Sequence, residues 1–151
     1  MRTAILSLLA AGALAALSSP AVALQAGGCQ LSLRAEAEAS SFADAGRNAA
    51  PARTAQLARV TGTAFAAAAS HLCASGVVQA AHLRPYSKLL VRNAEGAAEP
   101  AVYDDAEERP GALIIEYAFA DGGAPAQGAI EAAIRCWRDP EREGCLDEVS
   151  P

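Results

Sequence analysis

The stretch GALIIEYAF, residues Gly111–Phe119, decides the fold class. It is short, it is rich in β-branched and aromatic residues, and it lies between Pro110 and the pair Gly122 and Gly123. An apolar run of this length and composition, bounded by Pro and Gly, indicates a buried β-strand rather than a helix. We expect it to be the central strand of a sheet. Every second residue would point into the core, namely Leu113, Ile115, Tyr117 and Phe119.

The first 23 residues predict a secretory signal peptide. A basic start at Arg2 precedes the uncharged apolar run Ala4–Leu17, and residues 21–23 have the small-x-small form that signal peptidase cleaves. The run is shorter than the ~20 apolar residues that span a bilayer. We therefore expect cleavage after Ala23 and a protein that is periplasmic or secreted.

The remaining residues, 24–151, have the length of a single small domain. Cleavage after Ala26 is an alternative. Lipidation would place Cys29 first, but Ala26 stands where a lipoprotein signal normally has Leu, so an unlipidated product is favoured.

The charge composition argues against nucleic acid as a partner. The full chain has 12 Lys and Arg against 17 Asp and Glu, and removing residues 1–23 takes away only Arg2. The mature chain is thus acidic, with 11 basic residues and a net charge of about −6. Nucleic-acid binding needs a concentrated basic surface. No second apolar run is long enough to cross a membrane.

Four cysteines predict two disulfides, because an even count in a small exported domain is typical of a disulfide framework. Three pairings are possible. We favour Cys29–Cys73 with Cys136–Cys145, which would tie the first strand to a long helix and close the C-terminal tail. The spacing includes no C-x-x-C motif of a redox centre or a haem attachment site.

Periodicity predicts the other elements. Alternation from Cys29 to Ala35 indicates a half-buried strand, and a 3,4-spaced apolar stripe between Pro51 and Gly76 indicates a long helix. Further strands are expected at 87–93 and 100–104, and a second helix between Pro125 and Asp139. The order β-α-β-β-β-α predicts an α+β domain: an antiparallel sheet of about four strands with two helices on one face.

The best candidate binding residues are basic and aromatic. If residues 84–92 are extended, one face carries Arg84, Tyr86, Lys88 and Arg92. Such a stripe could recognise an anionic ligand, a cell-wall polymer or an acidic protein surface. Alternatively it pairs across the sheet with acidic residues such as Glu99, Asp104 or Glu116.

Neither a metal nor a cofactor is expected. The acidic cluster Asp104, Asp105, Glu107 and Glu108 lacks the alternating spacing of a calcium loop and is typical of a solvated connection. The two histidines, His71 and His82, have no partner at metal-ligand spacing.

No catalytic residues are assigned, because the sequence has no nucleophile elbow and no phosphate-binding glycine loop. The favoured hypothesis is therefore a non-enzymatic module that binds an envelope protein or a cell-wall component through its exposed sheet face. One alternative is a small exported hydrolase that uses Asp104, Asp105 or Glu116 beside His82 or Tyr86. The other is a ligand carrier with a cavity among Phe65, Tyr117, Phe119 and Trp137.

Overall fold

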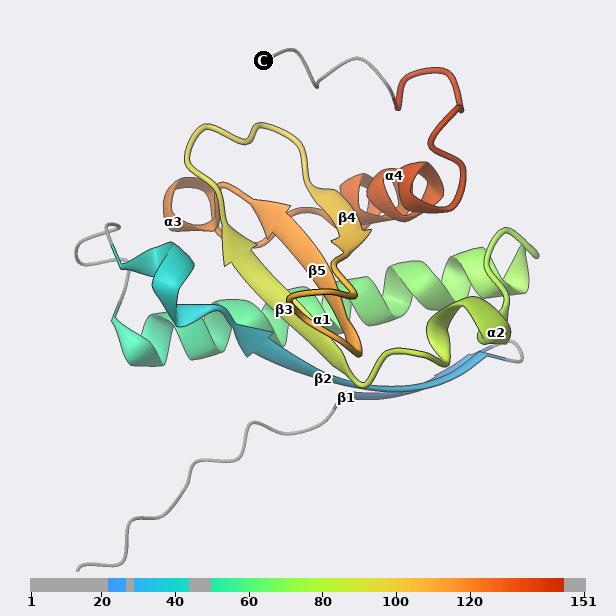
Figure 1. Ribbon diagram of the computed structural model, residues 1–151, viewed down its shortest axis with the longest axis horizontal. Helices are drawn as coiled ribbons and strands as arrows, with labels where there is room; N and C mark the ends of the chain where they lie inside the picture. Colours follow the sequence, from blue (N-terminus) through green and yellow to red (C-terminus); the bar gives the residue numbers. More distant parts are fainter. Residues whose placement is uncertain (1–21, 27–28, 44–49, 146–151) are drawn as a thin grey trace, which may run out of the picture.

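The computed structural model describes residues 22–26, 29–43 and 50–145 of the 151-residue chain. Its elements in chain order are β1 (Val22–Ala26), β2 (Cys29–Ala37), the 3-10 helix η1 (Ala39–Phe42), α1 (Pro51–Ala74), α2 (Ala80–Leu83), β3 (Lys88–Asn93), β4 (Ala101–Asp104), β5 (Ala112–Tyr117), α3 (Phe119–Gly122) and α4 (Gln127–Arg138) (Figure 1). The predicted order β-α-β-β-β-α is present as β2, α1, β3, β4, β5 and α4, so the α+β class is confirmed.

The sheet is mixed, and the prediction of an antiparallel sheet is wrong for its centre. The strand order is β1-β2-β3-β5-β4. The pairs β2–β3 and β3–β5 are parallel, and only the outer pairs β1–β2 and β4–β5 are antiparallel. The physical reason is the connection: α1 lies between β2 and β3 in the chain and returns it to the starting end, as parallel strands require. In the chain, β4 comes between β3 and β5. In the sheet, β5 lies between β3 and β4, beside β3 and parallel to it.

Strand β1 was not predicted, because its residues were assigned to the signal peptide and the start of the mature chain. It pairs with β2 from Ala26 opposite Cys29 to Val22 opposite Leu33. Only Gly27 and Gly28 separate the two strands in sequence, a dipeptide typical of a two-residue hairpin. The predicted cleavage point after Ala23 therefore falls inside a strand.

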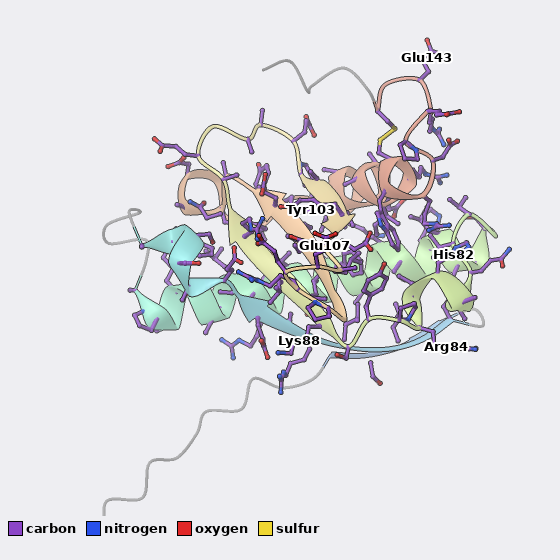
Figure 2. The ribbon with its side chains drawn as sticks, in the orientation of Figure 1. His82, Arg84, Lys88, Tyr103, Glu107 and Glu143 are labelled. Atoms are coloured by element: carbon purple, nitrogen blue, oxygen red, sulfur yellow. A yellow bond between two sulfur atoms is a disulfide. The ribbon has the colours of Figure 1, made fainter. Side chains whose placement is uncertain are left out.

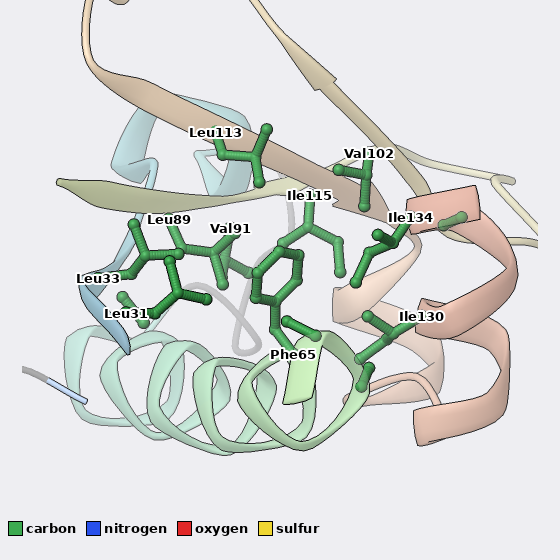
Figure 3. Close-up of a cluster of buried hydrophobic side chains, with 14 of the residues drawn as sticks. Leu31, Leu33, Phe65, Leu89, Val91, Val102, Leu113, Ile115, Ile130 and Ile134 are labelled. Carbon is green, nitrogen blue, oxygen red and sulfur yellow. The ribbon is translucent and has the colours of Figure 1, made fainter. Parts of the chain in front are cut away.

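The core lies between the sheet and the two long helices, α1 and α4. Figure 3 shows Phe65 of α1 and Ile130 and Ile134 of α4 on the same side of the sheet. They pack against alternate strand residues, namely Leu31, Leu33, Leu89, Val91, Val102, Leu113 and Ile115. Full burial of each Leu, Ile or Val side chain stabilises the fold by about 1.5–3 kcal/mol. The shorter helices α2 and α3 lay outside the prediction.

Two large core residues, Phe42 and Phe119, lie in short helices that were not predicted. Phe42 is fully buried although the sequence around it shows no period, and η1 positions it. Phe119 is buried as predicted, but it begins helix α3 rather than ending strand β5. Its ring contacts Phe42, with centroids 6.5 Å apart.

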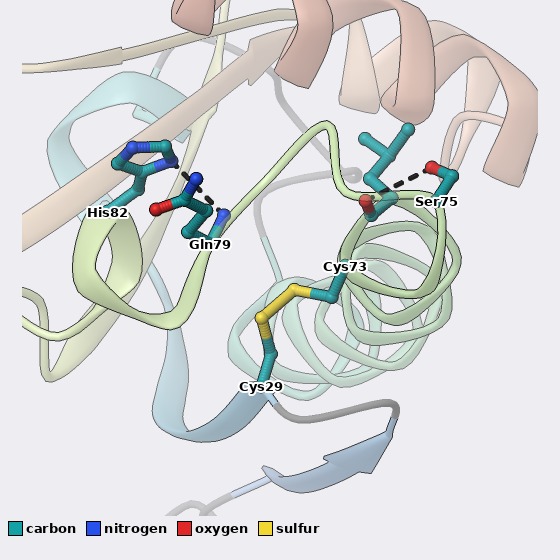
Figure 4. Close-up of a disulfide and its surroundings, with 6 residues drawn as sticks. Cys29, Cys73, Ser75, Gln79 and His82 are labelled. Atoms are coloured by element: carbon teal, nitrogen blue, oxygen red, sulfur yellow. Dashed lines mark hydrogen bonds between the residues drawn. A yellow bond between two sulfur atoms is a disulfide. The ribbon is translucent and has the colours of Figure 1, made fainter.

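Both favoured disulfides, Cys29–Cys73 and Cys136–Cys145, are present. The first joins the start of β2 to the last turn of α1 (Figure 4). That turn is fixed by Gly76, whose φ of +76° permits the left-handed helix end that glycine favours. The N–H groups of Gly76 and Val77 then donate to the carbonyls of Cys73 and Leu72, which is the Schellman pattern.

Candidate functional site

The face of the sheet opposite α1 and α4 carries most of the charged strand residues. We call it the open face; Figure 1 views the sheet from this side, with α1 behind it. The strand register places Arg92 of β3 opposite Glu116 of β5. Glu38, which directly follows β2, lies on the other side of Arg92 in the same row. In the next row, Leu90 lies opposite Glu36 and Ile114. Because alternate residues point to opposite faces, this surface uses the same strands that build the core.

Arg92 is the centre of a polar cluster on the open face. Its Nε donates to Glu38 Oε2 at 2.6 Å, and its Nη2 donates to Glu38 Oε1 at 3.1 Å. Its Nη1 donates to the Tyr103 hydroxyl at 2.7 Å, which in turn donates to Glu116 Oε2 at 2.8 Å. A forked Arg–carboxylate pair of this kind fixes both side chains. The cluster therefore ties the end of β2 to β3, β4 and β5.

The connection between β4 and β5 crosses the open face. Arg109, on that connection, donates from Nη2 to Glu38 Oε1 at 3.1 Å, which requires it to reach past β3 to the end of β2. In Figure 1 this segment passes in front of β5 and β3. Ile114 points to the open face yet is fully buried, and it does not belong to the main core cluster. The crossing segment thus covers the apolar middle of an otherwise polar face.

The electrostatics of the cluster favour fixed charges. The hydrogen bond from Arg92 is the largest cause that lowers the pKa of Glu38 below its usual value, and Arg109 acts in the same direction against partial burial. The same bond raises the pKa of Arg92. Burial and the bond to the Glu116 carboxylate raise the pKa of Tyr103 to about 12. The pKa values of these three groups are moved away from neutral pH, whereas a general acid or base works best with a pKa near the working pH.

The other end of the open face is less tightly paired. Arg34 and Lys88 lie side by side on β2 and β3, and both contact the carboxylate of Glu36. The Lys88 ammonium is 3.7 Å from it, and the side chains of Arg34 and Lys88 are 46% and 43% exposed. Two cations therefore share one anion, which leaves an excess positive charge on the surface of an acidic protein. Figure 2 shows Lys88 at the margin of this face and Tyr103 and Glu107 near its middle.

Of the four predicted binding residues, the structure brings two together on the open face. Lys88 and Arg92 point there from β3. Arg84 instead caps the end of α2, and Tyr86 packs edge-on against Trp137 with ring centroids 5.9 Å apart. The condition for the four-residue stripe, an extended chain from residue 84, is not met, because the strand begins only at Lys88. Arg92 and Lys88 do pair with carboxylates across the sheet, as the alternative interpretation of the stripe expected. Their main partners, Glu38 and Glu36, were not among the acidic residues named for it.

The acidic cluster does not assemble into a site. Asp104 accepts from Trp137 Nε1 at 3.3 Å, and Asp105 Oδ1 accepts from the N–H of Glu108 at 3.0 Å. Glu107 and Glu108 lie on the solvated surface of the connection, with Glu107 exposed. In the part of the chain that the structure describes, no group of three His, Cys, Asp or Glu side chains is arranged to hold a metal ion.

The histidines have local partners. His82 Nδ1 accepts from the N–H of Gln79 at 3.2 Å at the start of α2 (Figure 4), so it is not in a loop as expected. His71 Nδ1 is 2.9 Å from Glu131 Oε2 and links α1 to α4. The carboxylates of the hydrolase hypothesis are therefore not hydrogen-bonded to either histidine within the described residues.

The four aromatic residues of the carrier hypothesis pack against other side chains and do not form one group around a shared space. Phe65 and Phe119 are fully buried in the core, Tyr117 packs on Phe119 with centroids 5.5 Å apart, and Trp137 packs on Tyr86.

Among residues 22–26, 29–43 and 50–145, no helix is both long and apolar enough to cross a membrane.

Sequence reasoning missed three members of the polar cluster: Glu38, Tyr103 and Arg109. Glu38 and Tyr103 come together through the parallel pairing of β2 and β3 and the insertion of β5 beside β3, which local periodicity does not reveal. One signal was available. Glu36 and Glu38 continue the alternation of the first strand, so a longer strand would have put both on its polar face.

Comparisons of the chain with family models, with curated proteins and with solved structures find no match.

Proposed function

We propose that this chain is an exported, disulfide-stabilised binding protein of the cell envelope that contacts an envelope protein or a cell-wall component through its open face. The observation that carries the proposal is the contrast on β3: Leu89 and Val91 are buried in the core, whereas the neighbouring Lys88 projects 43% exposed from an ordered, polar surface. Rigid elements that present exposed charged side chains are suited to recognition.

The chemistry of the partner follows from the charge at the Arg34–Lys88 end of this face. Because these two cations share the single carboxylate of Glu36, one positive charge is available to a ligand. A partner that offers carboxylates or phosphates there would complete the pairing through charge-assisted hydrogen bonds. The Arg92 cluster, whose charges already pair internally, would position the surface rather than bind the ligand.

The basic start, the apolar run and the small-x-small site in residues 1–23 support export. The two disulfides support it too, since disulfides persist in oxidising compartments. The test is the intact mass of the protein isolated without reductant from the envelope fraction of its own cells. We expect a chain that begins at Leu24 and lacks four protons. A chain that retains residues 1–23, or one with free thiols, would contradict export.

Binding through the open face can be tested by photo-crosslinking in cells. A photoreactive residue would replace Glu107, which is exposed on the segment that crosses this face, or Val60, which is 49% exposed on α1 behind the sheet. We expect a defined adduct from position 107 that the control at position 60 does not form. Equal labelling from both positions, or none from position 107, would reject the open face as the binding surface.

A further inference from the structure

We propose that the mature chain forms a symmetric dimer by antiparallel pairing of two β2 strands through their free edge, centred on Ala35. The free β2 edge is the side of residues 34–37 that faces away from β3. This proposal rests on the export proposed above, because cleavage after Ala23 sets where the mature chain begins.

The backbone of β2 presents hydrogen-bonding groups at this edge. The N–H groups of Arg34 and Glu38 donate to Ser87 and Val91, so the even residues of this segment point toward β3. Successive residues of a strand alternate in direction, so the N–H and C=O groups of Ala35 and Ala37 point to the opposite side. Within the described residues, β1 covers that side only as far as Leu33. An uncovered edge of this kind is a template for another strand.

The side chains select a second copy of β2 as the occupant. In an antiparallel pair centred on Ala35, Arg34 of each copy lies opposite Glu36 of the other, which gives two pairs of opposite charge. Sliding the register by two residues in one direction would oppose the two copies of Arg34, and in the other direction the two copies of Glu36. Opposite charges across a ladder stabilise it, and like charges destabilise it. The sequence of β2 is therefore self-complementary in one register, as a twofold interface requires.

Signal-peptide removal completes the edge. Val22 and Ala23 occupy the positions opposite Leu33 and Ser32, and cleavage after Ala23 removes these two residues alone from β1. In the proposed register, Leu33 is the residue that pairs with Ala37 of the other copy. The uncleaved chain thus blocks part of the interface, and the chain that begins at Leu24 frees it.

The two copies would be held together by backbone hydrogen bonds and charge pairs, because few large apolar side chains in the described part of the chain are exposed. Among residues 29–43 and 50–145, Val60 is the only large hydrophobic side chain that is exposed. A broad apolar contact is therefore missing from that part of the surface, and the dimer is held by the ladder and by its two charge pairs. Such an interface is small, so the dimer should dissociate on dilution.

The test is sedimentation velocity on the chain that begins at Leu24, with both disulfides formed, over a range of concentrations. We expect a reversible monomer–dimer equilibrium. Arg34→Glu and Glu36→Arg should each weaken it about tenfold or more, because each opposes like charges. An equimolar mixture of these two variants should dimerise again, since each Glu then faces an Arg. The double variant Arg34→Glu with Glu36→Arg should also recover.

A chain that begins at Val22 serves as the control for cleavage, and it should dimerise more weakly than the chain that begins at Leu24. A Leu24 chain that stays monomeric at every concentration would overturn the proposal. It would also be overturned if Arg34→Glu and Glu36→Arg left the dimerisation affinity unchanged, or if the chain that begins at Val22 dimerised as tightly as the chain that begins at Leu24. Because the starting residue is set by expression, a different natural N-terminus would contradict the export site without affecting this test.

Discussion

The two faces of the sheet differ in what holds them together. The covered face is apolar and contacts α1 and α4 through side chains such as Leu89 and Ile115, both fully buried. The open face carries Lys88, Arg92 and Glu116 on the same two strands, one residue away in sequence. The alternation of strand residues lets one short segment provide stability on one side and a charged surface on the other.

The open face is ordered by ionic contacts rather than by a layer of helices. Arg92, Tyr103 and Arg109 connect the strand ends and hold the crossing segment over Ile114. The covered face should therefore dominate the free energy of unfolding. The open face should contribute little to that free energy and determine binding.

The largest effect is expected from a cavity in the covered face. Phe65 on α1 is 1% exposed, and Phe65→Ala should lower the free energy of unfolding by about 3–5 kcal/mol. Val60→Ala on the exposed side of the same helix should change it by less than about 0.5 kcal/mol. Urea denaturation of both variants measures the difference. Equal losses would show that α1 does not carry the core.

The Cys29–Cys73 disulfide links the covered face of β2 to α1 across 44 residues. Replacing both cysteines with Ala should destabilise the fold by up to about 4 kcal/mol on the loop-entropy model, because the unfolded chain regains freedom. The matched control, Cys136→Ala with Cys145→Ala, opens a separation of only 9 residues and should cost up to about 2.6 kcal/mol. Thermal unfolding that ranks the two pairs in the reverse order would contradict this account.

On the open face, Glu38→Gln should cost about 1–2 kcal/mol, because it removes the charge that Arg92 and Arg109 share. Glu36→Gln, at a more exposed carboxylate that also faces two cations, should cost less than about 0.5 kcal/mol. The measurement is urea denaturation at neutral pH.

The Glu38 effect should also depend on pH. Folding lowers the pKa of Glu38 from 4.5, so its contribution is present above pH 4.5 and is lost as the pH falls through the lower, folded-state pKa. The free energy of unfolding of wild type should therefore approach that of Glu38→Gln under acidic conditions. A difference that stays constant with pH would show that the carboxylate charge is not the cause.

A smaller effect than that of Glu38→Gln is expected from Tyr103→Phe, which removes the hydroxyl between Arg92 and Glu116 and should cost about 0.5–1 kcal/mol. Because folding raises the pKa of Tyr103 to about 12, its contribution is present below pH 10 and is lost as the pH rises through about 12. An ultraviolet titration should show one tyrosine of the folded protein ionising near pH 12, and the variant should lack it.

Local pattern predicted the covered face well. Leu113 and Ile115 fall on the core side as their alternation indicates, and β5 lies inside the sheet order. The long helix and both disulfides were also predicted, because spacing of 3 and 4 residues and an even cysteine count can be read directly from the sequence.

The open face could not be predicted in the same way. Its cluster depends on β5 re-entering beside β3, a choice of connection that leaves no trace in the period of either strand. Tyr86 was placed on the binding stripe because its spacing from Lys88 fits an extended chain. Helix α2 and the contact with Trp137 override that spacing.

Lys88 and Leu89 provide the most direct test of the whole account, since they are adjacent on β3 and point to opposite faces. The measurement is the crosslinking yield from position 107 together with the free energy of unfolding, for Lys88→Ala and for Leu89→Ala. We predict that Lys88→Ala keeps its stability within about 0.5 kcal/mol and loses the adduct. Leu89→Ala should lose about 2–5 kcal/mol while its folded fraction still forms the adduct. A Lys88→Ala protein that crosslinks as wild type would contradict the assignment of binding to the open face.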